Sequence, residues 1–146
     1  VIQDAVGELP RRLPRQDFVT GFRRNALAGG IATAIEVPLE QDARGVYLEF
    51  ARQRQDLALV NVCVVRSTGS SCAVIGGLHD TPVQLPAVDA ALSASMPPTL
   101  ALLTEALSGA SLNTPSDLHG SADYRRHLAV VLLTRAHAAL AAEFAL

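Results

Sequence analysis

Few side chains in this sequence could carry chemistry on their own, and they are widely spaced. The candidates are four histidines and two cysteines: His79, His119, His127, His137, Cys63 and Cys72. No two histidines stand four residues apart, and the nine-residue spacing of the cysteines matches no zinc or iron–sulfur motif. His127 and His137 share a face of one predicted helix but lie about three turns apart, which excludes a joint metal site there. We therefore predict no metal site and no catalytic residue, but structural or surface histidines and buried free thiols.

Two glycine pairs could in principle cradle a phosphate, at Gly29–Gly30 and Gly76–Gly77. A phosphate loop needs a strand before it and a helix after it, so that the helix N-terminus faces the phosphate. After the first pair, the alternation of residues 31–38 predicts a strand that ends at Pro38. The second pair ends a strand and leads into a proline-containing loop. We therefore predict a turn at Gly29–Gly30 and a strand end at Gly76–Gly77, and a phosphate loop at neither.

The stretch from Tyr47 to Asp56 opens as a strand and then becomes strongly polar, with Arg52 and Gln55 among its residues. One interpretation is a solvated, charge-balanced hairpin loop, which the composition alone favours. The other is a loop laid over a planar cofactor, in which Tyr47 supplies an apolar face and the charged side chains set the local potential.

Two arginines, Arg125 and Arg126, follow Tyr124 in the first turns of a predicted helix. Cations at a helix N-terminus oppose the helix dipole. We therefore expect a carboxylate from elsewhere in the fold to pair with them, in a structural role.

A short antiparallel sheet followed by helices must position these residues, which is an α+β fold. Residues 1–30 are a loop-rich lead-in. After residues 31–38 and the strand that opens at Tyr47, strands are predicted over 57–66 and 72–78, joined by a hairpin turn over 67–71. Helices are predicted over 86–94 and 98–110, each with proline in its first position, and over 122–144 with Ser121 as N-cap. Ser108 and Gly109 end the second helix.

The chain of 146 residues is 49% hydrophobic and has a net charge of −2. This length fits one domain, or one small domain and a piece of another. The charge balance excludes a broad cationic face, so we expect no nucleic-acid partner. No apolar run approaches the ~18 residues of a membrane span, and no signal peptide is recognisable at the start, which predicts a cytoplasmic protein. The chain lacks an initiator Met, so we expect it to be a piece of a longer polypeptide. All basic residues are arginine, which is typical of a GC-rich bacterial genome.

Four segments, taken in order, resemble the C-terminal part of the FAD-binding medium subunit of molybdenum hydroxylases, the family of carbon monoxide dehydrogenase and xanthine dehydrogenase. They are RRLPRQDFVTGFRRNALAGGIATAIEVP, YLEFARQRQDLALVNVCVV, GGLHDTPVQLPAVDAAL and GSADYRRHLAVVLLTRA. Each segment alone is weakly specific, but their order and spacing cover nearly the whole chain.

The resemblance implies that residues 1–45 are the tail end of the FAD-binding domain. Residues 46–146 would be the C-terminal domain, a small antiparallel sheet beside a helical bundle. In this family electrons pass from a molybdopterin centre through iron–sulfur clusters to FAD and then to an acceptor. The implied partners are therefore iron–sulfur and molybdopterin subunits. The family's segment at Tyr47 lies by the isoalloxazine ring, so the resemblance carries flavin contact to Tyr47 and a place in the charged loop to Arg52, Gln55 and Asp56.

The sequence departs from the family pattern at three places. Glu49 stands where the family commonly has Lys, Gly30 stands near a usual Glu, and the glycine-rich pyrophosphate motifs belong upstream of everything in this chain. Without those loops few backbone N–H donors remain for a pyrophosphate, so we expect the chain alone to bind FAD weakly or not at all and to be inactive by itself. The alternative function is a non-catalytic α+β packing or dimerisation module.

Overall fold

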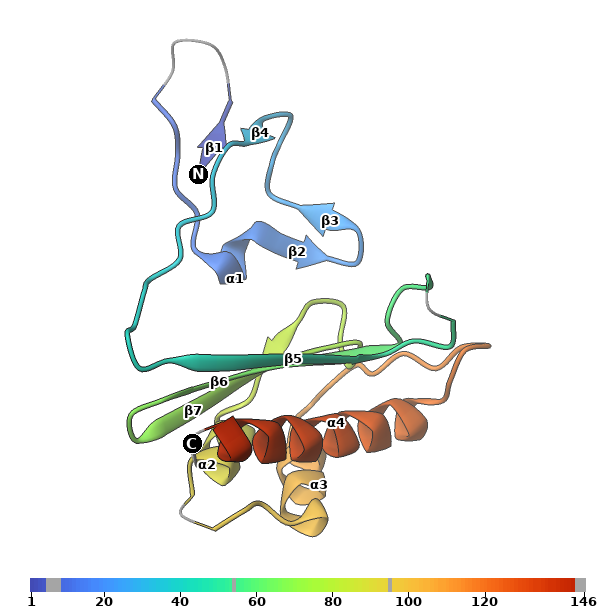
Figure 1. The fold of residues 1–146 in the computed structure, drawn as a ribbon. Coiled ribbons are helices and arrows are strands. Elements are labelled where there is room, and N and C mark those ends of the chain that lie inside the picture. The colour runs from blue at the N-terminus through green and yellow to red at the C-terminus, as the bar shows by residue number, and fades with distance from the viewer. Residues whose placement is uncertain (5–8, 54, 95, 144–146) are drawn as a thin grey trace. The chain divides into compact units, whose positions relative to one another are not determined.

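The chain forms two units, residues 1–39 and residues 40–146 (Figure 1). The computed structural model describes residues 1–4, 9–53, 55–94 and 96–143. Within the described residues, each unit has its own sheets, and helices longer than one turn occur in the second unit only. Strands come first in the second unit and helices follow, which confirms the predicted α+β class.

The first unit consists of short elements joined by turns. They are β1 (Ile2–Gln3), α1 (Arg15–Phe18), β2 (Val19–Gly21), β3 (Arg24–Asn25) and β4 (Ile31–Ala32). β1 pairs antiparallel with β4, and β2 pairs antiparallel with β3. These elements span only two to four residues each, so loops and turns dominate the unit, as its sequence predicts.

The strand predicted over residues 31–38 is wrong beyond Ala32. Ile35 and Val37 lie outside β4 and are 89% and 69% exposed. Alternating apolar residues favour an extended chain, but a strand also needs a hydrogen-bonded neighbour. Along this segment β1 pairs with Ile31 and Ala32, and Val1 adds hydrogen bonds to Thr33 and Ala34. Among the described residues, no backbone hydrogen bond involves Ile35 or Val37.

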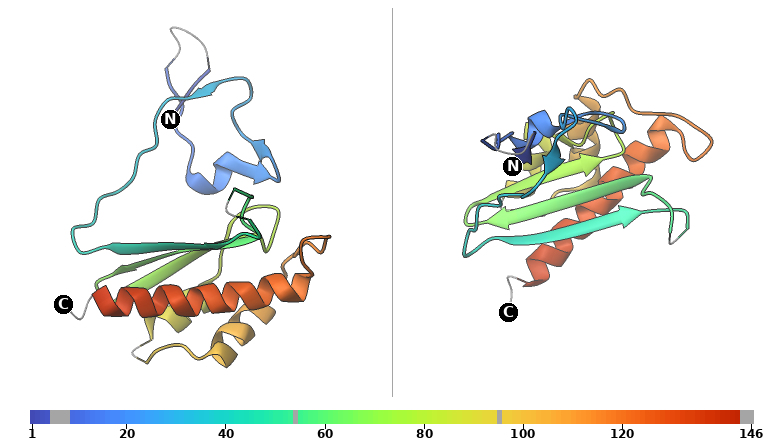
Figure 2. Two further views of the ribbon diagram at one scale, coloured as in Figure 1. Left: turned by 45° about the vertical axis from the view of Figure 1, so that its right-hand side comes forward. Right: turned by 90° about the horizontal axis from the view of Figure 1, so that it is seen from above.

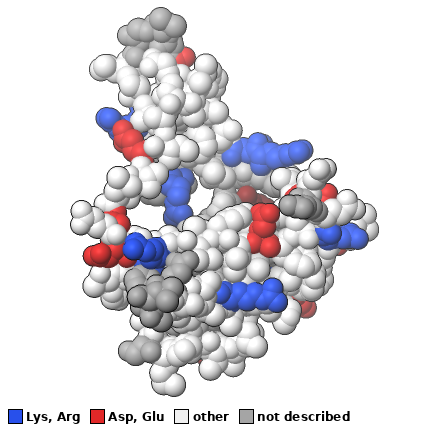
Figure 3. Space-filling view, in the orientation of Figure 1, with Lys and Arg blue, Asp and Glu red and all other residues white. Residues whose placement is uncertain are grey.

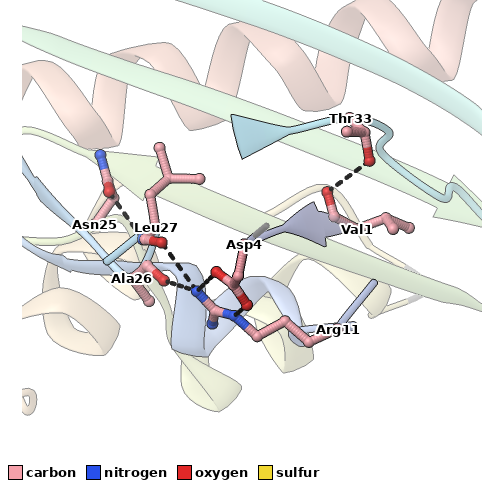
Figure 4. A network of polar contacts seen from close by, with 7 residues as sticks. All are labelled: Val1, Asp4, Arg11, Asn25, Ala26, Leu27 and Thr33. Carbon is pink, nitrogen blue, oxygen red and sulfur yellow. Dashed lines mark hydrogen bonds and ion pairs between the residues drawn. The ribbon is translucent and has the colours of Figure 1, made fainter. Parts of the chain in front are cut away.

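One arginine ties distant segments of the first unit together (Figure 4). Arg11 Nε donates to Asp4 Oδ2 at 2.7 Å, and its Nη2 donates to the carbonyl oxygens of Ala26 and Leu27 at 2.8 and 3.0 Å. Asn25 Oδ1 accepts a hydrogen bond from Leu27 N at 3.1 Å. The segment before the first glycine pair is therefore held by polar contacts.

The second unit is built on a four-stranded antiparallel sheet with strand order β5-β6-β7-β8. Its strands are β5 (Arg44–Phe50), β6 (Val60–Ser67), β7 (Ser70–Gly76) and β8 (Val83–Gln84). The turn between β6 and β7 contains Gly69 at φ +79°, a conformation that glycine adopts without strain. The predicted hairpin is confirmed, although β6 begins three residues later than expected.

Three helices lie on one side of this sheet, two of them directly on its face (Figures 1 and 2). They are α2 (Pro86–Ser93), α3 (Leu100–Ser108) and α4 (Ala122–Glu143). α4 lies along β5 and β6, α2 packs on β7, and α3 packs against both other helices. Pro86 is the first residue of α2, as predicted, whereas Pro98 precedes α3, whose N-cap is Thr99. Ser121 Oγ accepts from Tyr124 N at 3.2 Å, which confirms the predicted cap of α4.

The core of the second unit lies between the sheet and its three helices. On β6 the alternate residues Val60, Val62 and Val64 are almost fully buried. Most buried residues of α4 recur at three- and four-residue steps, the spacing of one helix face; they are Arg125, Leu128, Ala129, Leu132, Leu133, Ala136, His137 and Leu140. Val130 is buried beside this stripe. Next to this stripe, Val131 is half-buried and Arg135 is exposed.

Helix α2 completes the β7 edge where β8 does not reach. β8 pairs only with Val74 and Ile75. Beyond them Asp89 Oδ1 accepts from Ala73 N at 2.7 Å and Ser93 Oγ accepts from Ser71 N at 2.8 Å. Side chains of α2 therefore replace a strand's backbone acceptors and protect the edge.

In the part of the chain that the structure describes, no helix combines the length and apolarity needed to cross a bilayer.

Candidate functional site

Tyr47 lies on β5, on the face of the sheet opposite the helices. The neighbouring residues Val46 and Leu48 turn toward the core, so Tyr47 and Glu49 share the outer face. The Tyr47 ring is 57% exposed, and its hydroxyl donates to Glu49 Oε2 at 2.8 Å. By accepting this hydrogen bond, Glu49 raises the pKa of the Tyr47 hydroxyl, and desolvation adds to the rise. An exposed aromatic ring held by its own strand can offer an edge or face to a planar ligand.

The predicted charged loop follows β5 directly. Arg52, Gln55 and Asp56 are all exposed in it. Asp56 N donates to the Gln53 carbonyl at 3.1 Å, which forms a turn inside the loop. The strand-then-loop reading of this stretch is therefore confirmed.

Tyr47 and the loop are separate features of one strand end. Tyr47 stands opposite Cys63, three residues before β5 ends at Phe50. At about 3.3 Å per strand residue, the Tyr47 Cα lies roughly 10 Å from the start of the loop. Among the described residues, no hydrogen bond or ion pair joins Tyr47 to the loop, and its hydroxyl is taken by Glu49. The two could still contact different parts of one extended ligand.

The base of the loop is held by α4. Leu59 N donates to the Phe50 carbonyl at 2.8 Å, which joins the two ends of the loop. Arg125 Nη1 donates to the Leu59 carbonyl at 3.0 Å, and Nη2 pairs with Asp117 Oδ2 at 2.7 Å. The rings of Phe50 and Tyr124 meet edge to face, with centroids 6.2 Å apart.

The expected carboxylate partner of the α4 arginines is therefore Asp117, and it serves Arg125. The hydrogen bond from the backbone N–H of His119 is the largest cause of the lowered pKa of Asp117, and Arg125 lowers it further. Arg126 Nη2 lies instead 3.5 Å from the Leu112 carbonyl oxygen. The sequence signals that a partner is needed but not which one, because Asp117 comes from a loop that no periodic pattern describes.

The first glycine pair lies in a turn and the second ends a strand, since Gly76 is the last residue of β7, and both outcomes are as predicted. Gly30 N donates to the Leu27 carbonyl at 2.9 Å across a turn that contains Gly29 at φ +90°. A Cβ on Gly30 would stand 2.5 Å from Asp4 Oδ1, so the space next to this glycine is occupied by a side chain of the same unit. Gly77, at φ +89°, likewise lets the Leu59 backbone approach.

Neither Cys63 nor Cys72 forms a disulfide in the described part of the chain, and the prediction that both thiols are buried is wrong. Cys63 is half-buried and Cys72 is exposed. The register places Cys63 opposite Val74 and Cys72 opposite Val65, so the two cysteines do not face each other. Both lie at alternate positions that turn away from the core, and an uninterrupted apolar sequence does not reveal which face a residue takes.

Of the four histidines, His137 alone is buried. His137 is 8% exposed on the core side of α4, where burial and then the charge of Arg66 lower its pKa. His79 Nδ1 accepts from Asn113 N at 3.3 Å. Within the described ranges, no three His, Cys, Asp or Glu side chains are grouped so that they could hold a metal ion.

The residues present fit part of a flavin but not all of it. Tyr47 and the exposed loop offer an aromatic ring and charges to an isoalloxazine system. A pyrophosphate needs several free backbone N–H groups, whereas Gly30 N is already bonded and its surroundings are filled. On the face seen in Figure 3, arginine and acidic side chains are interspersed, so that face has no continuous basic field.

A family model for the CO dehydrogenase flavoprotein C-terminal domain matches residues 45–140. The chain is 33% identical over 124 residues to the nicotine 6-hydroxylase medium subunit of Paenarthrobacter nicotinovorans, covering 81% of this chain and 44% of that subunit. It is 29% identical over 133 residues to the glyceraldehyde dehydrogenase medium chain of Sulfolobus acidocaldarius, covering 86% and 47%. The chain thus spans about half the length of these relatives.

Among solved structures, the carbon monoxide dehydrogenase of Hydrogenophaga pseudoflava superposes with a TM-score of 0.72 at 22% identity, covering 92% of this chain and 50% of that one. This likeness concerns the fold.

Proposed function

The chain belongs to the CO dehydrogenase flavoprotein C-terminal domain family, and from that premise we propose that it works within the FAD-binding medium subunit of a molybdopterin-dependent oxidoreductase. Its relatives are the medium subunit of a hydroxylase and the medium chain of a dehydrogenase. In the proposed enzyme, FAD receives electrons from iron–sulfur clusters that a molybdopterin centre reduces, and passes them to an acceptor. Iron–sulfur and molybdopterin subunits are the proposed partners.

The observation that carries this proposal is the exposed Tyr47 ring on the outer face of the sheet, beside an exposed charged loop. In a single domain, a half-exposed tyrosine with a hydroxyl tied to its own strand does little for the core. Facing a flavin, the ring would pack against the isoalloxazine. The side chains of Arg52, Gln55 and Asp56 would then set the potential on the acceptor side.

In this proposal, residues 1–45 belong to the FAD-binding domain and residues 46–146 form the C-terminal domain. The family match begins at residue 45, and the first unit ends at residue 39. The first unit carries six large apolar side chains that are at least 69% exposed: Leu9, Phe22, Ile31, Ile35, Val37 and Leu39. The remainder of a FAD-binding domain would cover such residues. It would also supply the pyrophosphate loops that the described residues lack.

The experiment compares this chain with a chimera. The part of the Paenarthrobacter nicotinovorans subunit outside the matched segment is fused upstream of this chain, and both proteins are incubated with FAD and dialysed. We expect the chimera to keep flavin absorption and the chain alone to lose it. A chimera that is folded by circular dichroism yet colourless would contradict the proposal and support the alternative, a packing or dimerisation module.

Variants of the chimera then test the site. Tyr47→Ala should alter flavin fluorescence and the rate of flavin reduction, because the ring is removed. Tyr47→Phe keeps the ring, loses only the bond to Glu49, and should preserve both readouts. Equal flavin behaviour of all three proteins would remove Tyr47 from the site.

A further inference from the structure

The loop that carries Arg52, Gln55 and Asp56 is anchored at its C-terminal end by Leu59. Its N–H is bonded to Phe50 and its carbonyl to Arg125, so both backbone polar groups of Leu59 are engaged. Leu59 is also 6% exposed and belongs to the core. Whatever fixes Leu59 therefore fixes the end of the loop.

Leu59 is closely surrounded by two glycines and by the side chain of Arg125. Gly77 has a positive φ, and a Cβ there would collide with the Leu59 carbonyl oxygen. A Cβ on Gly120 would stand 3.2 Å from Leu59 Cδ2. Two glycines from different segments thus leave just the room that Leu59 occupies, and the arginine of a third element donates to its carbonyl oxygen.

The guanidinium of Arg125 is itself held in place. Arg125 is 6% exposed, and Asp117 accepts from its Nη2 at 2.7 Å. Asp117 Oδ1 in turn accepts from the backbone N–H groups of His119 and Gly120, at 2.8 and 3.2 Å. Two acceptors on different loops are joined through one planar fork, which lysine could not reproduce.

A buried cation is a costly way to fill a core, because an apolar side chain of similar volume often serves stability as well. The feature that an apolar residue could not supply is the donor to the Leu59 carbonyl. We propose that Arg125 is a positioning residue that holds the charged loop after β5 in the place where it meets its ligand. The role of the loop at the flavin rests on the proposed function, whereas the anchoring itself does not.

The first test is tryptic cleavage of the full chain, because Arg52 is exposed within the loop. In Arg125→Met we expect cleavage after Arg52 to be faster by about tenfold or more, the factor that loss of a hydrogen bond to a charged group implies. Cleavage after Arg23 in the first unit is the internal reference and should not change. Arg126→Met is the matched control, since Arg126 lies one residue away and reaches the Leu112 carbonyl instead.

A general loss of folding would show as faster cleavage after Arg135, in the middle of α4, and a rise there equal to that at Arg52 would overturn a positioning role. Should Arg125→Met fail to fold, Asp117→Asn weakens the hold on the guanidinium while leaving the Leu59 contact, and should speed cleavage by a smaller factor. Unchanged cleavage in a folded Arg125→Met, or an equal increase in Arg126→Met, would also overturn the proposal.

The second test places Arg125→Lys in the flavin-loaded chimera, with KM and kcat for the electron acceptor measured separately. Positioning of an acceptor-side loop predicts a higher KM, with flavin content preserved. Faster loop cleavage with unchanged acceptor kinetics would uphold the anchor and refute the flavin-side role of the loop. The two proposals therefore fail separately.

Discussion

The two units of this chain treat their apolar residues in opposite ways. In the second unit one face of the sheet and three helices enclose a continuous core, with residues such as Val62, Ile75 and Leu133 fully buried. In the described part of the first unit, Ile2 is the one buried hydrophobic residue, although isoleucine, valine, leucine and phenylalanine are common there. The first unit is held by backbone pairing and by the polar contacts of Arg11.

Hydrophobic residues alone therefore do not form a core; they also need a second layer to pack against. The second unit supplies both a sheet face and a helix stripe, so each buries the other. The first unit has strands of two or three residues and no helix beyond α1 among its described residues, so its apolar side chains find no second layer. A FAD-binding domain around residues 1–45, as proposed, would provide that layer.

The largest expected difference between the two units is the loss of stability when a leucine side chain is removed. Leu133→Ala removes a fully buried side chain from α4 and should lower the free energy of unfolding by about 2–5 kcal/mol. Leu39→Ala makes the same chemical change at a side chain that is 95% exposed and should cost less than ~0.5 kcal/mol. Urea unfolding followed by circular dichroism measures both. Similar losses for the two variants would mean that the units do not differ as described.

A smaller effect tests the edge of the sheet. Asp89→Ala leaves Ala73 N without its acceptor and should cost about 1–3 kcal/mol, the penalty of an unsatisfied donor. Asp89→Asn keeps one carbonyl oxygen at the same place and should recover most of that loss. The same denaturation experiment compares them, and hydrogen exchange at Ala73 should rise in Asp89→Ala only. An Asn variant as unstable as the Ala variant would show that the charge, rather than the acceptor, matters.

The smallest effect is a dependence of stability on pH that belongs to the second unit. Burial lowers the pKa of His137 in the folded protein below its ordinary value near 6.5. The unfolded chain therefore takes up a proton first as the pH falls, so stability is full above pH ~6.5 and declines below it. Unfolding of the wild type at pH 7.5 and pH 5.5 should show this decline, and His137→Gln should reduce it.

His127→Gln is the control for that measurement, because His127 is exposed on the same helix. It should leave the decline unchanged. A wild-type stability that rises toward pH 5.5 would contradict the direction of the His137 shift.

Much of the second unit could be predicted from local signals. The polar turn after β6, Pro86 at the start of α2, Gly109 after α3 and the Ser121 cap all act within a few residues, so a short window of sequence contains their cause. The order and spacing of four sequence segments carried the resemblance to the family, which the match over residues 45–140 confirms.

The candidate site was predictable only in part. The sequence indicates that Tyr47 and the charged loop are close along the chain, and that Arg125 needs an acidic partner. It does not indicate that Tyr47 bonds to Glu49, nor that Arg125 reaches Leu59, 66 residues away along the chain. Those contacts depend on how β5 and α4 are placed over one another.

Periodicity, turn residues and caps by themselves thus determined the α+β order of elements, the hairpin and the three helices, because each is a property of neighbouring residues. The tertiary structure decided which face of the sheet Cys63 and Cys72 occupy, that the strand after Gly30 stops at Ala32, and that Arg125 donates to the Leu59 carbonyl. Each of these depends on a distant segment that pairs with the strand, covers the sheet face or donates a hydrogen bond. Local sequence preferences do not predict such contacts, because the free energy that stabilises them comes from residues far apart in the chain.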